Sequence, residues 1–274
     1  MALSKLKTRV VSATVLVALL LLVTFTSAWI FSVAVSVISF VVLRELLLTF
    51  KMNTKPALLI IDYIATIALL VTVLVQRQVS GVFYLILSLF IMAALTVSVI
   101  HHQKVSFSDV CASIFAVIYA VLFLLPLSFM RHQENGLALV FLAFIGAWIP
   151  DTAAYFVGCM IGKHKLIEAI SPKKTIEGSV GAIVGSVVGF LLYGALLSSM
   201  GYYVDFFGLV ILSLLCGVVA QLGDLSASLI KRTYQAKDFS NLIPGHGGLL
   251  DRVDSLFFVA PIVYYFISFF PVLM

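Results

Sequence analysis

The chain has 274 residues, of which 62% are hydrophobic and only 11% are charged, and its mean hydropathy is +1.19. A soluble domain is roughly half apolar and about a quarter charged, so this composition excludes an ordinary soluble protein. The net charge of +5 does not by itself indicate a nucleic acid partner, and we expect none. The three cysteines are far apart and lack zinc-binding spacing, so we expect them to be apolar packing residues.

Hydrophobic runs follow one another along the chain, each near the roughly 20 residues that a transmembrane helix needs. Nine spans are expected, at 10–28, 29–49, 57–75, 80–100, 108–130, 136–157, 178–198, 206–230 and 255–273. The predicted fold class is all-α, a polytopic integral membrane protein. Residues 1–140 would hold five helices and residues 141–274 four helices with polar loops at 158–177 and 231–254, the two parts forming one structural unit.

Basic residues indicate the orientation of these spans, because cytoplasmic loops of membrane proteins are enriched in Lys and Arg. With the N-terminus placed in the cytoplasm, all but two of the 17 basic residues fall on the cytoplasmic side, and the exceptions are Arg77 and Arg131. The basic residues that precede the first span, beginning at Lys5, resemble the start of a secretory signal peptide. A second apolar run follows the first almost directly, so we expect the first span to be an uncleaved transmembrane helix. The C-terminus would then be external, and both long polar loops would face the cytoplasm, where nucleotides are found.

The sixth span carries Pro150 and Asp151. An ionisable residue in a membrane helix is costly and is a functional candidate by default. The loop that follows offers two ammonium groups and two hydroxyls ahead of the seventh span, a set suited to phosphate binding; these residues are Ser171, Lys173, Lys174 and Thr175. An ordinary positively charged loop is the alternative. Glycines recur at spacings of three and four along the seventh span, from Gly178 to Gly189, and predict a helix-packing face.

Polar residues also line the end of the eighth span. Asp224, Ser228 and Lys231 are spaced so that they share one helix face. They indicate either a site for metal and phosphate or a structural Asp–Lys pair.

A glycine-rich loop leads into the ninth span. Its sequence runs from Pro244 to Gly248, and glycines allow the backbone amides to approach and cradle a phosphate. Asp251 and Asp254, three residues apart, would share a helix face and could ligate one or two divalent ions. Glu45, at the end of the second span, is assigned no chemistry.

The segment from Ser228 to Asp254 resembles the signature of the phosphatidate cytidylyltransferases. The matching residues are Ser228, Lys231-Arg232, Lys237-Asp238, Pro244-Gly245-His246-Gly247-Gly248 and Asp251-Arg252-Val253-Asp254, all at the family's spacing without a gap. Stretches around Asp151 and Lys173 resemble the same family, so that the resemblance covers residues 145–257. Residues 1–140 match only in general character.

This resemblance implies an enzyme of phospholipid biosynthesis in a bacterial-type plasma membrane, with its active site facing the cytoplasm. It would use CTP and phosphatidate to make CDP-diacylglycerol and pyrophosphate, with one or two Mg²⁺ ions. The catalytic residues would be Asp224, Lys231, Arg232, His246, Asp251 and Arg252. The substrate-binding residues would be Asp151, Ser171, Lys173, Lys174, Thr175, Ser228, Lys237, Gly247 and Gly248. The metal ligands would be Asp224, Asp251 and Asp254.

Two alternatives remain at this point. One is another CTP-dependent membrane lipid enzyme, such as a polyprenol kinase or a cytidylyltransferase for an isoprenoid ether lipid. The other is an ion-coupled transporter, although the paired repeats common in transporters are not visible. The sequence leaves open a homodimer, the acyl-chain preference, the number of metal ions and the role of His246.

Overall fold

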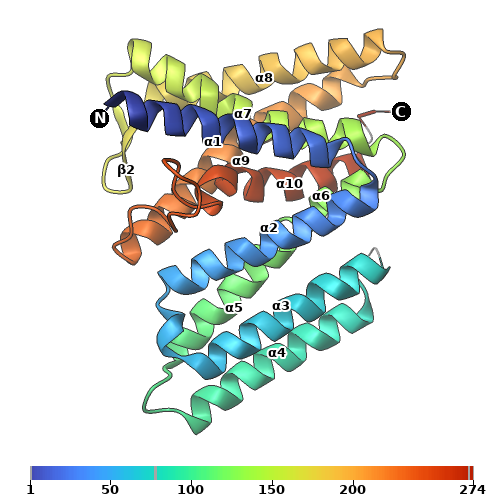
Figure 1. Cartoon of the computed structure of the whole chain (residues 1–274). Helices are drawn as coiled ribbons and strands as arrows, with labels where there is room; N and C mark the ends of the chain where they lie inside the picture. Colours follow the sequence, from blue (N-terminus) through green and yellow to red (C-terminus); the bar gives the residue numbers. More distant parts are fainter. Residues whose placement is uncertain (1, 77–78, 271, 274) are drawn as a thin grey trace. The chain divides into compact units, whose positions relative to one another are not determined.

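The computed structural model describes residues 2–76, 79–270 and 272–273, without the side chains of residues 2–9 and 76, and it is mainly helical (Figure 1). The helices are α1 (Ala2–Thr24), α2 (Ala28–Thr49), the 3-10 helix η1 (Met52–Thr54), α3 (Pro56–Gln76), α4 (Gly81–Ile100), α5 (Phe107–Leu122), α6 (Leu125–Arg131), α7 (Gly136–Ile161), α8 (Ile176–Ser199), α9 (Phe206–Thr233) and α10 (Leu250–Phe269). The strands are β1 (Lys165–Ile167) and β2 (Ser171–Thr175). The side chain of Lys5 and the whole of Arg77 lie outside the described part.

Eight helical segments of the described chain are long and apolar enough to cross a membrane. The apolar part of α1, Val10–Thr24, is shorter. The prediction of an all-α, polytopic membrane protein is thereby confirmed.

The chain divides into two compact units. The N-terminal unit comprises Met1–Phe129 and Tyr234–Asp251, and the C-terminal unit comprises Met130–Thr233 and Arg252–Met274. The glycine-rich loop thus belongs with the N-terminal helices, although it follows α9 in the sequence. That residues 1–140 and 141–274 form one structural unit stays a prediction.

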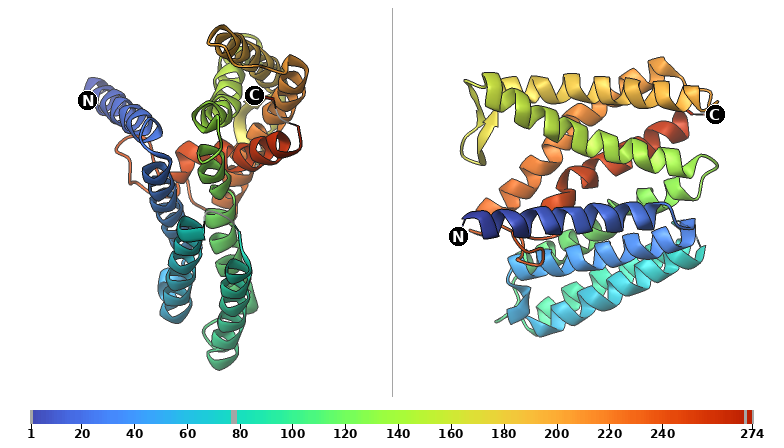
Figure 2. Two further views of the ribbon diagram at one scale, coloured as in Figure 1. Left: turned by 90° about the vertical axis from the view of Figure 1, so that its right-hand side faces the viewer. Right: turned by 45° about the horizontal axis from the view of Figure 1, so that its top comes forward.

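In the N-terminal unit, α3 and α4 form a hairpin of adjacent helices, and α2 packs against α5 (Figures 1 and 2). Leu43, Leu46 and Leu47 on α2 are completely buried in this unit. The returning segment is attached by stacking of Tyr234 on Phe50, whose ring centroids are 4.7 Å apart. The end of α2 therefore lies at the attachment point of the returning segment.

The structure differs from the sequence prediction in three places. The fifth span is formed by two helices, since Pro126 lacks an N–H and its ring would clash with the Leu122 carbonyl of a continuous helix. The loop at 158–177 contains the antiparallel β1–β2 hairpin, in which Lys165 lies opposite Thr175. The last helix begins at Leu250, earlier than the expected start at 255, so Asp251 and Asp254 belong to its first turns.

In the C-terminal unit, α8 packs along α7 and against α9 (Figure 2). The glycines of α8 make the first contact close. A Cβ atom at Gly185 would lie 2.3 Å from Ala153 Cβ, and one at Gly181 would lie 2.6 Å from Val157 Cβ. The predicted glycine packing face is therefore confirmed.

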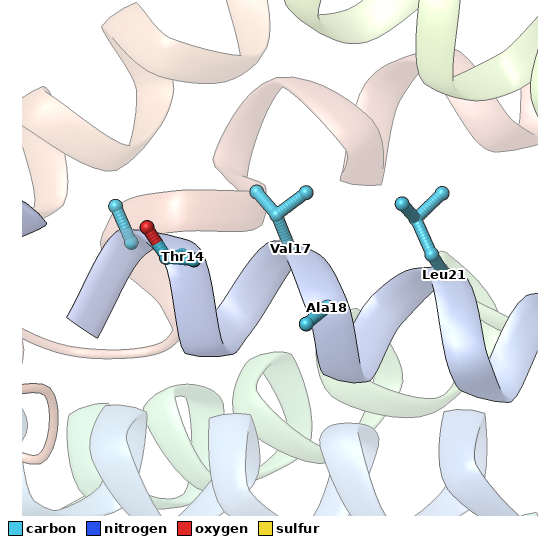
Figure 3. Close-up of a pocket in the computed structure, with 5 residues that line it drawn as sticks. Thr14, Val17, Ala18 and Leu21 are labelled. Atoms are coloured by element: carbon cyan, nitrogen blue, oxygen red, sulfur yellow. The ribbon is translucent and has the colours of Figure 1, made fainter. Parts of the chain in front are cut away.

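A shallow groove of about 410 Å³ runs along α1 (Figure 3). Its lining consists of Ala13, Thr14, Val17, Ala18 and Leu21. This lining carries one hydroxyl group and no charge, so the groove is mainly apolar.

Candidate active site

The C-terminal unit holds an ion pair between its hairpin and a membrane helix. Lys174 Nζ on β2 lies 2.5 Å from Asp224 Oδ2 on α9, and both side chains are partly exposed, at 20% and 29%. Successive side chains of a strand point to opposite sides, and the preceding Lys173 is exposed. The two lysines of the predicted phosphate-binding loop therefore have different surroundings.

Two further carboxylates accompany this pair. Ser255 Oγ on α10 donates a hydrogen bond of 2.5 Å to Asp151 Oδ2 on α7. The buried Asp254 accepts a hydrogen bond from Ser255 N at 2.9 Å and interacts electrostatically with Asp224 and Asp151. Three helices thus bring three carboxylates of the C-terminal unit into one electrostatic cluster, which we call the carboxylate cluster: Asp151, Asp224 and Asp254.

Small residues let the backbone come close at this cluster. A Cβ atom at Gly223 would lie 2.7 Å from the Asp254 carbonyl oxygen and 3.1 Å from Ser255 Cα. Gly223, the residue before Asp224, therefore allows α9 to contact the first turns of α10 closely. Ser228, one turn after Asp224 on α9, is buried.

Hydrogen bonds hold the hairpin at both ends, and their residues include the predicted substrate contact Thr175 and the predicted catalytic residue Arg232. Thr175 caps α8, because its Oγ1 accepts a hydrogen bond from Gly178 N at 3.1 Å. Arg232 Nε donates to the Ile170 carbonyl at 3.3 Å. Glu177, not predicted, accepts hydrogen bonds from His164 Nδ1 at 2.6 Å and Lys163 N at 3.1 Å. These contacts fix β2, which carries Lys174.

The glycine-rich loop of the N-terminal unit is a tight turn. Gly245 and Gly247 have φ values of 78° and 83°, which other residues rarely adopt. Ile243 N donates to the Gly247 carbonyl at 2.9 Å, and Asp251 Oδ2 accepts from Gly248 N at 2.9 Å. Asp251 also accepts from Phe239 N at 3.0 Å. One carboxylate oxygen of the predicted metal ligand Asp251 therefore organises the loop.

His246 and Glu45 hold the loop to the N-terminal helices. Ser12 Oγ on α1 lies 3.0 Å from His246 Nδ1 and donates to the Pro244 carbonyl at 3.0 Å. Glu45 on α2 accepts hydrogen bonds from Ser240 Oγ and from Leu249 N. Neither Ser12 nor Glu45 was predicted from the sequence. The one signal for Glu45 was that it is an ionisable residue at the end of an apolar span.

The remaining predicted residues are placed as follows. Lys231 interacts electrostatically with Asp254, while Lys237 and Arg252 are exposed. Ser171 is partly buried at the start of β2. The part of the chain that the structure describes contains no group of three or more His, Cys, Asp or Glu side chains placed to hold a metal ion.

Together these features define a membrane protein with a carboxylate cluster beside basic groups, and with a glycine turn whose amides are ordered by carboxylates. The model of the cytidylyltransferase family matches residues 7–270. The chain belongs to the cytidylyltransferase family.

Curated relatives in three bacteria are each named phosphatidate cytidylyltransferase. The chain is 32% identical to the Staphylococcus aureus protein over 266 residues, which are 94% of this chain and 97% of the relative. It is 35% identical to the Staphylococcus saprophyticus protein over 233 residues, 82% of this chain and 85% of the relative. It is 35% identical to the Bacillus subtilis protein over 195 residues, 70% of this chain and 71% of the relative.

Proposed function

We propose that this protein transfers the cytidylyl group of CTP to phosphatidate, yielding CDP-diacylglycerol and pyrophosphate. Membership of the cytidylyltransferase family and the names of the relatives support the reaction. The observation that carries it in the structure is the Lys174–Asp224 pair beside the carboxylate cluster. An ammonium group suited to binding phosphate lies there next to a carboxylate of a membrane helix, and this supports the proposal.

In this reaction, a phosphate oxygen of phosphatidate attacks the α-phosphorus of CTP. The bond between the α-phosphorus and the bridging oxygen to the β-phosphorus breaks, and pyrophosphate leaves with the electron pair. Both reactants are anions, so the residues of the site must offset their repulsion. No side-chain nucleophile is needed.

Lys174 would bind a substrate phosphate by exchanging the Asp224 carboxylate for it. An ammonium group binds phosphate as a point charge, and Lys174 is held in place by β2. Lys231, Arg232, Lys237 and Arg252 are proposed as further phosphate contacts. The backbone amides of Gly247 and Gly248 are also proposed as phosphate contacts. In the structure, Gly248 N–H donates its hydrogen bond to Asp251.

Mg²⁺ is the proposed ion, with Asp224, Asp254 and Asp251 as the proposed ligands. Mg²⁺ is usually held by one or two carboxylates together with water and substrate phosphates. The carboxylates of the cluster offer oxygen donors of the kind that Mg²⁺ takes, and this chemistry supports the proposal. When bound, the ion would supply neutralisation of the charge on the phosphate oxygens. Asp251 is included among the proposed ligands because it belongs to the sequence signature. Its Oδ2 atom accepts the hydrogen bonds from the loop.

The site is proposed to face the cytoplasm of a bacterial plasma membrane. The distribution of Lys and Arg along the chain supports this orientation, and the bacterial relatives support the membrane. A homodimer stays a prediction from the sequence.

Purified protein incubated with labelled CTP, phosphatidate and Mg²⁺ tests the reaction. We expect labelled CDP-diacylglycerol and an equal amount of pyrophosphate. Release of CDP together with a phosphorylated lipid would indicate a kinase instead. Absence of turnover with any lipid phosphate would contradict a transferase.

A further inference from the structure

The carboxylate of Glu45 is almost completely buried, with 1% of the residue exposed. It lies near the end of α2, in a part of the chain for which the sequence predicted no function. Burying a carboxylate is costly unless hydrogen bonds compensate it. The partners of this carboxylate therefore indicate what it does.

Three hydrogen-bond donors to Glu45 belong to the returning segment of the N-terminal unit. Oε1 accepts from Ser240 Oγ at 2.6 Å and from Leu249 N at 2.8 Å, and Oε2 accepts from Leu250 N at 2.8 Å. Leu250 is the first residue of α10 and Leu249 directly precedes it. The first backbone N–H groups of a helix have no partner within the helix. A residue about 200 positions earlier thus caps the helix that carries Asp251.

The glycine turn lies so close to the Glu45 carboxylate that Gly248 has no room for a side chain. A Cβ atom at Gly248 would lie 2.7 Å from Glu45 Oε1 and 2.9 Å from Oε2. Asp251 also accepts hydrogen bonds from this segment, donated by Phe239 N and Gly248 N. Residues 239–240 and 248–250 are therefore held by two carboxylates, one from α2 and one from α10.

We propose that Glu45 is a positioning residue of the cytidylyl transfer, fixing the glycine turn and the start of α10 so that Asp251 and the loop amides are preorganised. This inference rests on the proposed function. Glu45 touches no reacting atom and acts only through the residues that it holds. Residues that orient the groups of a site typically contribute about 10- to 100-fold to activity.

Glu45→Gln is the central variant, because it keeps the shape and removes the charge. The amide has one oxygen, whereas the three donors need both oxygens of the carboxylate, and its NH₂ group would face a donor. We expect kcat to fall by about 10- to 100-fold while KM for CTP changes by less than about threefold. Asp62→Asn is the matched control, since Asp62 on α3 is also fully buried but accepts its hydrogen bond from Ser113. We expect this control to keep its kcat.

Hydrogen exchange of residues 239–250 gives a readout that does not depend on activity. We expect faster exchange of this segment in Glu45→Gln and wild-type exchange in Asp62→Asn. If wild-type protein makes no CDP-lipid, the proposed function fails, but the exchange result still decides whether Glu45 holds the turn. Unchanged exchange in Glu45→Gln, or wild-type kcat, overturns the inference.

Gly248→Ala supplies an independent test of the geometry. The added methyl group would collide with the Glu45 carboxylate, and Glu45→Ala would open that space. The double variant should therefore be no less active than Glu45→Ala alone. Additive losses from the two substitutions would contradict direct contact between the carboxylate and the turn.

Discussion

Lys173 and Lys174 are adjacent in the sequence, but only Lys174 faces a carboxylate. Lys174 pairs with Asp224, and Lys173 is exposed on the other side of β2. We therefore expect Lys174→Ala to raise KM or lower kcat so that kcat/KM falls by about 10-fold or more, as the loss of a charged hydrogen-bonding group does. Lys163→Ala is the matched control, because Lys163 is an exposed lysine of the same loop outside the proposed site, and its activity should stay within about twofold of the wild type. Equal losses in the two variants would contradict the assignment of Lys174.

Asp224 is expected to be essential for turnover rather than for folding. Its side chain is partly exposed, so Asp224→Asn should cost little stability, but it removes the negative charge beside Lys174. We expect kcat to fall by about 100-fold or more, with a thermal midpoint close to that of the wild type. In the Lys174→Ala background the further loss should be smaller than in the wild type, because the two residues interact. A well-folded Asp224→Asn protein with near-normal activity would remove Asp224 from the site.

The sequence indicated individual polar residues more readily than their interaction partners. Asp224, Asp254 and Lys174 could be identified from their polarity in apolar surroundings. Their mutual arrangement could not, because it depends on three helices and a hairpin that are distant in the sequence. Ser255 as the donor to Asp151, and Glu45 as the acceptor at the start of α10, were missed for the same physical reason.

At the scale of elements, the contact between α7 and α8 depends on glycine. A side chain at Gly185 would overlap Ala153, whereas a methyl group added at Gly81, at the start of α4, would have no atom within 4 Å. We expect Gly185→Ala to destabilise the protein by about 1–3 kcal/mol through overpacking. Gly81→Ala should leave the thermal midpoint nearly unchanged, and an equal shift in both variants would mean that the packing face is unimportant.

Helix positions were predictable because apolar runs of membrane length are a strong signal, and the spans coincide with the helices in most of the chain. Interruptions were harder to predict. The apolar run is continuous through the break before α6. Predicting that break would have required the clash of Pro126 with the Leu122 carbonyl to be considered. The β1–β2 hairpin is short and polar, and its five-residue second strand is stabilised by contacts of its ends rather than by an apolar pattern.

At the scale of the whole molecule, orientation in the membrane is a prediction from charge. A reporter inserted next to Lys163 should report a cytoplasmic position, and one fused after Met274 should report an external position. The measurement is the paired activity of reporters that function on only one side of the membrane. Signals from the same side for both positions would contradict the odd number of spans.

The return of residues 234–251 to the N-terminal unit has a consequence for biosynthesis. The backbone passes between the units three times, after Phe129, Thr233 and Asp251. Ribosomes add about 5–20 residues per second, so the helices before Phe129 enter the membrane several seconds before the segment that completes their unit is made. During that interval, Glu45 lacks the three donors that later satisfy it. The N-terminal unit therefore stays incomplete during that interval, and nascent chains released before residue 240 would leave the Glu45 carboxylate without these three donors.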